Sequence, residues 1–198
     1  SLAAMIARNP LSPTRSANML KSITEAIVYA HQEGVIHRDL KPANVLLDKR
    51  RSPHISDFGL AKKTTSGSQL TVTGQIIGTP SYMPPEQASG ETNLIGPAAD
   101  IYSLGAILYC CLTGRPPFQA ANPMETLRQV VERDPVSPRQ LNSQIDQDLD
   151  TICLKCLEKD PQRRYATAQD LVDELERFLN GEPIKARPIS ALDRSLRW

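Results

Sequence analysis

The sequence lacks a strong excess of charge of either sign. Its 198 residues carry 23 Lys and Arg against 22 Asp and Glu, so the formal net charge is +1. A general nucleic-acid surface or a polybasic membrane patch needs a marked basic excess, and the balance argues against both as the main activity. The content of 40% hydrophobic and 23% charged residues excludes an intrinsically disordered chain and is close to the average of globular domains.

Long apolar segments and a metal-binding cysteine pattern are missing as well. The longest apolar run, residues 101–112, has 12 residues, which is too short to span a bilayer and suits a buried core helix. Cys110 and Cys111 are adjacent, and Cys153 and Cys156 form one C-x-x-C pair. No second such pair and no His pair completes a zinc site. We therefore expect buried, reduced thiols and a cytoplasmic protein.

Helical periodicity dominates what is present. Apolar residues recur at helical spacing in four segments, which are 14–33, 101–112, 149–157 and 167–181. Asp100 is in place to cap the second helix, and Thr167 with Asp170 resembles a capping box that starts the fourth. Two short β-prone runs, 44–47 and 54–56, are joined by charged residues and predict a hairpin. The predicted fold class is mainly α with a small β-hairpin.

A polar stretch at residues 37–44 carries most of the chemistry. It reads His-Arg-Asp-Leu-Lys-Pro-Ala-Asn, and Asp-Phe-Gly follows at 57–59. Two carboxylates, an amide and a cation thereby lie on loops at the ends of short strands: Asp39, Lys41, Asn44 and Asp57. Asp and Asn oxygens suit Mg²⁺, a further carboxylate can deprotonate a hydroxyl, and a Lys can neutralise phosphate oxygens. These are the requirements of phosphoryl transfer, although a purely structural Asp-rich turn before a hairpin is the alternative interpretation.

These motifs resemble the catalytic loop and the metal-binding motif of the protein kinases. Three later runs resemble that family in the same order, namely 78–86 (end of the activation segment), 100–105 (start of the central helix) and 160–164 (the late Arg motif). Lys41 followed by Pro42 is the serine/threonine form of the loop. Residues 1–180 are therefore identified as similar to the C-terminal lobe of the protein-kinase fold, in the eukaryotic-like bacterial serine/threonine protein kinases.

The resemblance implies a role for each catalytic position. Asp39 would accept the proton of the substrate hydroxyl, and Lys41 would contact the transferred phosphate. Asn44 and Asp57 would hold Mg²⁺, and together with Lys41 they would bind ATP. Thr79 would lie against Asp39 and Lys41 and help define the acceptor pocket. The implied substrates are proteins with Ser or Thr acceptors, and no nucleic acid is implied.

Other positions are expected to be structural. His37 and Phe58 resemble a packing pair that holds the two loops together. Glu86 and Arg164 are expected to form a buried ion pair between the activation segment and the helical core. Asp100 is also expected to be structural, and capping of its helix explains it almost as well.

One hypothesis concerns regulation within the segment 61–99, which is rich in Thr, Ser, Gly and Pro. Arg38 directly precedes Asp39, and Thr71 and Thr73 lie in the loop between Asp57 and Glu86. A phosphate on either Thr could pair with Arg38 and order the segment. The alternative is that both are ordinary loop threonines.

Two departures from the family pattern stand out. Pro84 replaces the usual Ala before Pro85, and because a proline follows, we expect extended backbone there. The sequence also contains no G-x-G-x-x-G loop and no Val-Ala-Ile-Lys strand, and the 36 residues before His37 indicate helix. We therefore expect a kinase C-lobe without its N-lobe, inactive by itself, from a parent that transfers the γ-phosphate of ATP. The rival interpretation is a non-catalytic, kinase-derived binding or scaffold module.

The last segment, 181–198, reads as an exit linker. Its prolines, Pro183 and Pro188, interrupt helix, and it carries four cations before its terminal Trp198: Lys185, Arg187, Arg194 and Arg197. A basic stretch ending in Trp is typical of the cytoplasmic flank of a membrane span. One expectation is therefore a juxtamembrane segment with a membrane anchor beyond Trp198 and the lobe in the cytoplasm. The other is a solvated linker to a further soluble domain.

Overall fold

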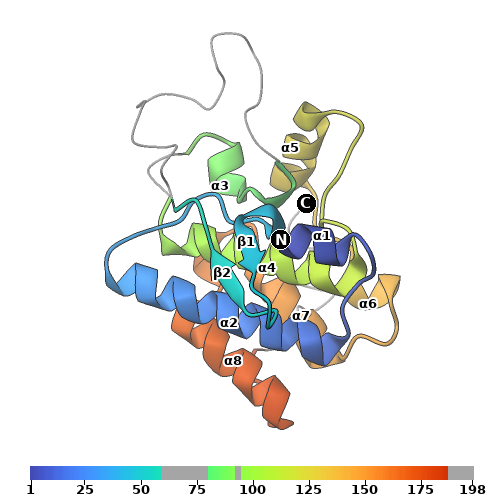
Figure 1. The fold of residues 1–198 in the computed structure, drawn as a ribbon. Coiled ribbons are helices and arrows are strands. Elements are labelled where there is room, and N and C mark those ends of the chain that lie inside the picture. Colours follow the sequence, from blue (N-terminus) through green and yellow to red (C-terminus); the bar gives the residue numbers. More distant parts are fainter. Residues whose placement is uncertain (59–79, 92–94, 187–198) are drawn as a thin grey trace.

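The computed structural model describes residues 1–58, 80–91 and 95–186 (Figure 1). The helices are α1 (Leu2–Ile6), α2 (Pro13–Gln32), α3 (Pro85–Ala88), α4 (Pro97–Thr113), α5 (Pro123–Glu132), α6 (Pro138–Leu141), α7 (Gln147–Cys156) and α8 (Ala168–Asn180). The strands are β1 (Val45–Leu47) and β2 (Pro53–Ile55), and single 3-10 turns lie at Pro42–Asn44, Pro80–Tyr82 and Pro161–Arg163. The predicted class, mainly α with one small hairpin, is confirmed over this part of the chain.

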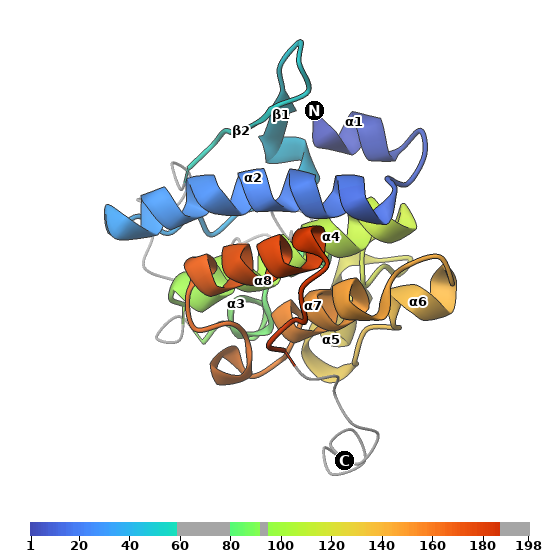
Figure 2. The ribbon, with the colours of Figure 1, turned by 90° about the horizontal axis from the view of Figure 1, so that it is seen from below.

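Helix α4 forms the centre of the core. Each of its residues from Ala99 to Leu112 is buried, as expected for the longest apolar run of the sequence. Helix α2 packs against α8 and α4, and α4 packs against α7. Figure 2 shows α2 as a layer between the hairpin on one side and α8 on the other. The crossing of α4 and α7 is so close that a Cβ on Gly105 would collide with the Cβ of Cys156.

The hairpin carries the polar loops at its ends. Its antiparallel register pairs Val45 with Ile55 and Leu47 with Pro53. Val45 is fully buried, whereas Leu46 on the opposite face is exposed, so one face of this short sheet packs on the helices. Figure 1 shows the hairpin beside α1, above the middle of α2.

The ends of the helices agree with most of the sequence expectations. Gly34 follows α2 with φ 72°, a left-handed conformation that glycine adopts without strain. Thr167 caps α8, and its side chain and that of Asp170 form the predicted reciprocal capping box. Pro84 has the expected extended backbone, with φ −71° and ψ 152°.

The expected cap of the central helix is wrong. Helix α4 begins at Pro97 with Gly96 as its N-cap, and Asp100 therefore lies inside the first turn. Proline is favoured at the first helical position because its φ is preset and it has no N–H to leave unpaired, which explains the earlier start. The carboxylate of Asp100 is consequently free for long-range contacts.

The four cysteines are free and buried, as the sequence indicates. Burial raises the pKa of Cys156 to about 12, so this thiol stays protonated at neutral pH. Among the helices that the structure describes, none is long and apolar enough to cross a membrane.

The chain after α8 folds back onto that helix. Glu174, which is buried, accepts the backbone N–H of Lys185 at 2.7 Å and of Ala186 at 2.8 Å. Ala186 is itself part of the hydrophobic core. The packed part of the chain therefore continues past residue 180, where the sequence places the start of the linker.

Candidate active site

The backbone of the polar loop is held by one buried carboxylate. Asp100 on α4 is fully buried, and its oxygens accept the backbone N–H of His37 and of Arg38, each at 2.8 Å. The imidazole Nε2 of His31, on the last turn of α2, lies 2.9 Å from the same carboxylate. Arg38 has φ 67°, a conformation that costs free energy in a non-glycine residue and needs such support. The core thus imposes the shape of the loop.

Three of the expected catalytic side chains meet on this loop. Lys41 Nζ lies 2.9 Å from Asp39 Oδ2. Asn44 Nδ2 donates to the backbone oxygen of Asp39 at 2.9 Å and approaches its Oδ2 at 3.3 Å. Lys41 and Asn44 therefore orient the carboxylate of Asp39. The Asp39 side chain is half exposed, so the carboxylate is also accessible to an incoming group. This is the arrangement that a general base needs.

Asp57 lies at the opposite end of the hairpin from the turn, next to Asn44. Ser56, which precedes it, donates its backbone N–H to the Asn44 carbonyl at 2.9 Å and its hydroxyl to Asp57 Oδ2 at 3.1 Å. Asp57 has φ 63°, the left-handed region, which is one of three such non-glycine positions in the described residues. Two segments that are 13 residues apart in sequence are therefore fixed side by side.

The donor set fits Mg²⁺. Asn44 uses its amide N–H groups on Asp39, which leaves its amide oxygen as the available ligand, and Asp57 supplies a carboxylate. Mg²⁺ prefers hard oxygen ligands and takes only one or two from the protein, with waters and phosphate oxygens completing its shell. Asn44 and Asp57 would hold such an ion.

His37 packs rather than reacts. Its ring is fully buried and lies 4.8 Å from that of Phe58, measured between centroids. Its Nε2 lies 3.0 Å from the Ser56 carbonyl oxygen. The pair therefore joins the polar loop to the segment after β2, in the position that the sequence interpretation assigns to it.

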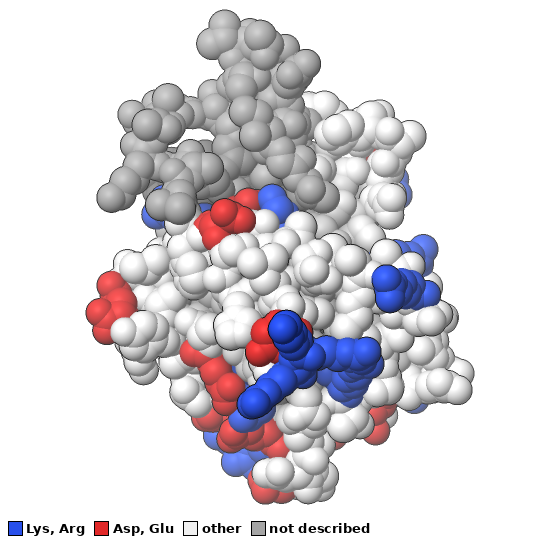
Figure 3. Space-filling model, viewed as in Figure 1, with Lys and Arg blue, Asp and Glu red and all other residues white. Residues whose placement is uncertain are grey.

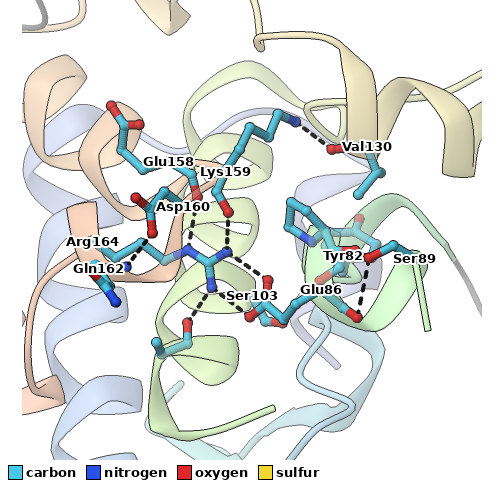
Figure 4. Close-up of polar contacts among 12 residues, drawn as sticks. Tyr82, Glu86, Ser89, Ser103, Val130, Glu158, Lys159, Asp160, Gln162 and Arg164 are labelled. Atoms are coloured by element: carbon cyan, nitrogen blue, oxygen red, sulfur yellow. Dashed lines mark hydrogen bonds and ion pairs between the residues drawn. The ribbon is translucent and has the colours of Figure 1, made fainter. Parts of the chain in front are cut away.

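The expected ion pair between Glu86 and Arg164 is present (Figure 4). The guanidinium donates to both carboxylate oxygens, at 2.8 and 2.7 Å, and both side chains are almost completely buried. Its remaining N–H groups donate to three backbone oxygens, those of Ala98, Glu158 and Lys159. Every donor of the buried cation is used, as burial of a charge requires.

Three expected site residues, Thr71, Thr73 and Thr79, lie outside the described residues. Two contributors were missed by the sequence interpretation, His31 and Ser56. A polar residue in the last turn of α2, just before the polar loop, was the available signal for His31. Ser56 carried none, because its role depends on the hairpin register.

Comparison with known proteins identifies the class to which this lobe belongs. Residues 1–175 match the family model described as "Protein kinase domain". The chain therefore belongs to the protein kinase family.

The relatives narrow the comparison to bacterial serine/threonine kinases. The chain is 39% identical over 178 residues to serine/threonine-protein kinase PknB of Mycobacterium tuberculosis, covering 89% of this chain and 28% of that protein. It is 40% identical over 177 residues to the probable serine/threonine-protein kinase SCO3848 of Streptomyces coelicolor, covering 89% of this chain and 26% of that protein. It is 33% identical over 181 residues to serine/threonine-protein kinase PrkC of Bacillus subtilis, covering 91% and 28%. The expected resemblance is confirmed, and the chain spans less than a third of the length of these relatives.

A solved structure supports the same fold. The crystal structure of Rad53 1-466 in complex with AMP-PNP superposes with a TM-score of 0.68 at 26% sequence identity. The match covers 87% of this chain and 43% of that chain.

Proposed function

We propose that this chain is the C-terminal lobe of an ATP- and Mg²⁺-dependent protein serine/threonine kinase. The observation that carries the proposal is the cluster of Asp39, Lys41 and Asn44 on a loop whose backbone is bonded to the buried Asp100. Membership of the protein kinase family supports it, as do relatives named serine/threonine-protein kinases. The neighbour that holds AMP-PNP, an ATP analogue, supports ATP as the nucleotide.

The proposed chemistry assigns one task to each group. Asp39 orients the acceptor hydroxyl and takes its proton, and Lys41 neutralises charge on the transferred phosphate. Asn44 and Asp57 hold Mg²⁺, which supplies charge compensation at the phosphate oxygens when bound. Catalysis of this kind depends on positioning and electrostatics more than on covalent steps, which accounts for a half-exposed base on a rigid loop. Thr79 remains a proposed contributor to the acceptor pocket.

The 198-residue chain by itself is proposed to be inactive. It contains neither a Gly-rich phosphate-covering loop nor the Val-Ala-Ile-Lys strand of the family. Half of the nucleotide contacts would be lacking, and binding of Mg²⁺-ATP by the chain alone is expected to be weak. The alternative is that the parent protein is a non-catalytic binding or scaffold module. The following experiment distinguishes this alternative from a kinase.

The test is Asp39→Asn in the full-length protein, assayed with γ-labelled ATP and a Ser/Thr protein substrate. General-base catalysis contributes about 10²–10⁴-fold, so we expect at least a hundredfold loss of rate. Asp173→Asn, the same substitution on α8 across α2 from the hairpin, is the control and should leave the rate unchanged. Retention of more than about a tenth of the rate in Asp39→Asn would exclude the general-base role.

Regulation by phosphorylation remains a proposal. Arg38, which precedes Asp39, would pair with a phosphate on Thr71 or Thr73 and order the segment that contains them. Phosphopeptide mapping of the active full-length protein and the activity of the Thr71→Ala/Thr73→Ala double variant test it. Two unmodified threonines with equal activity of the variant would exclude this regulation.

The remaining proposals concern domain limits and location. We divide the chain into a lobe over 1–180 and a linker over 181–198, with packing of residues 182–186 on α8 as an extension of the lobe. A cytoplasmic lobe with a membrane anchor beyond Trp198 is proposed from the basic end of the sequence. A run of about 20 apolar residues within the next forty codons would support the anchor, and its absence would exclude it.

A further inference from the structure

The turn between β1 and β2 presents three consecutive cations, Lys49, Arg50 and Arg51. All three are exposed. We call these three residues the basic turn. Figure 3 shows a group of blue side chains near the centre of this face, where Figure 1 places the hairpin. In a chain of net charge +1, this is a concentration of charge that the proposed kinase chemistry does not use.

The backbone of the basic turn is rigid. Asp48 Oδ1 accepts the backbone N–H of Arg50 and of Ser52, each at 2.8 Å. The Asp48 amide donates to the Ser52 carbonyl at 3.1 Å, and the Arg51 amide donates to the Asp48 carbonyl at 3.0 Å. Arg51 has φ 66°, held by these bonds and by the β1–β2 pairing. The three cations are therefore presented from a fixed support, which lowers the entropy cost of binding to them.

No carboxylate of the described residues neutralises the basic turn. The ion pairs in this part of the chain include none with Lys49, Arg50 or Arg51. The nearest acid, Asp48, uses Oδ1 on its own turn, and its Oδ2 lies 3.6 Å from His54 Nε2. The charge is thus available to an external anion.

We propose that the basic turn docks an acidic segment of a partner protein, through carboxylates or phosphorylated side chains. Adjacent arginines suit such groups, because a guanidinium binds carboxylate or phosphate with two parallel hydrogen bonds. A narrow protruding turn (Figure 2) fits an extended peptide, which can wrap around it. A flat bilayer would contact only the tip of such a protruding turn (Figure 2). Three cations are also too few for the 6–10 phosphate contacts of typical duplex DNA binding.

Because of its position, the basic turn could hold a docked partner near the proposed active site. Lys49 is five positions from Asn44 and Arg51 is six from Asp57, so at about 3.3 Å per residue the turn lies within about 20 Å of these two residues. A partner held by an acidic segment would be kept close to the proposed active site. Docking itself does not depend on kinase activity, so it can fail or succeed independently of the proposed function.

The test is binding of labelled peptides to the 198-residue chain, followed by fluorescence anisotropy at low and at physiological salt. Three peptides of equal length are compared, one rich in Asp and Glu, one with phosphoserines and one neutral. The variant is Lys49→Glu/Arg50→Glu. The matched control, Arg133→Glu/Arg139→Glu, makes the same charge change at two exposed positions elsewhere. Vesicles with 30% phosphatidylserine are tested in parallel.

We expect at least one acidic peptide to bind at least tenfold tighter than the neutral one. We also expect the turn variant to lose at least tenfold in affinity, and the control to stay within twofold. The tighter of the two acidic peptides identifies the source of the anion. Absence of peptide binding, an equal loss in both variants, or binding confined to vesicles would each overturn the proposal. If the turn variant unfolds more easily than the parent, Lys49→Gln/Arg50→Gln replaces it under the same criteria.

Discussion

Two buried carboxylates in this lobe are stabilised in different ways. Glu86 faces a guanidinium, and the pair with Arg164 is satisfied by direct charge compensation (Figure 4). Asp100 is equally buried, but its partners are two backbone amides and one imidazole. The first carboxylate joins two segments that are 78 residues apart, and the second sets the conformation of a loop.

The difference shows how the lobe separates stability from positioning. A guanidinium and a carboxylate form strong, bidentate hydrogen bonds, and they can join two segments of the chain wherever the two side chains reach each other. Backbone amides can bond a carboxylate only if the loop adopts one particular shape. We therefore expect changes at Glu86 or Arg164 to act on the whole fold, and changes at Asp100 to act on the loop as well.

Removal of the cation should have the largest effect. Arg164→Ala leaves Glu86 charged and buried without its partner, and we expect a loss of about 3–5 kcal/mol in the free energy of unfolding. Urea unfolding of the 198-residue chain measures it. Arg163→Ala is the matched control, because the neighbouring Arg163 makes a solvent-exposed pair with Asp160 and should cost less than about 0.5 kcal/mol. Similar losses in the two variants would show that the buried pair of Arg164 with Glu86 stabilises the fold no more than the exposed pair of Arg163 with Asp160 does.

The loop carboxylate should rank next. In Asp100→Asn only one oxygen remains to accept from His37 and Arg38, and the charge that strengthens both bonds is lost. We expect a loss of about 2–3 kcal/mol in the free energy of unfolding. Hydrogen exchange should also show weaker protection of the His37 and Arg38 amides. Asp146→Asn, at the N-cap of α7, is the control, because Asn caps helices as well as Asp does. Unchanged protection at 37 and 38 would contradict the role of Asp100.

The imidazole should contribute less than either carboxylate. His31→Ala removes one contact to Asp100 from a partly buried side chain and leaves both amide bonds in place. We expect a loss of about 1 kcal/mol, the usual net value of one hydrogen bond, in the same unfolding experiment. A loss as large as that of Asp100→Asn would mean that His31, and not the two amides, compensates the carboxylate.

The smallest effect on stability is expected for a change at Tyr102, which packs against the ion pair. The Tyr102 ring lies under the Arg164 guanidinium, 5.0 Å from its carbon, while its buried hydroxyl has no hydrogen-bond partner in the described residues. Tyr102→Phe keeps the ring and removes an unsatisfied group, so stability should stay the same or rise by up to about 1 kcal/mol. Tyr165→Phe, which loses the contact to Glu174, serves as the comparison and should not be stabilising. Destabilisation by Tyr102→Phe would show that the hydroxyl is paired after all.

Features with a local signal were predictable from the sequence. The hairpin, the capping box of α8 and the end of α2 at Gly34 each rest on a few adjacent residues, and all three are present. The pair between Glu86 and Arg164 was also predictable, but only through the resemblance of two distant motifs to one family.

The rest depends on long-range contacts that no local pattern records. By its chemistry Asp100 is a better cap than Gly96, but α4 starts earlier, at Pro97, and this frees the carboxylate of Asp100 for the loop. Glu174 reads as one more polar position of an amphipathic helix. Its burial follows from the return of residues 182–186, which two prolines in the segment made to look like a free linker.

The two hydrogen bonds that Glu174 accepts from the returning chain have a mechanical consequence. The amides of residues 185 and 186 both donate to one buried carboxylate, so these two residues are fixed to α8. Since Glu174 lies on α8, tension applied at residues 185 and 186 would be transmitted to that helix through its side chain. The bond from Ala186 is buried and that from Lys185 is partly buried, and the two would carry the load in parallel. The carboxylate therefore makes residues 185 and 186 part of one mechanical unit with α8 and the core.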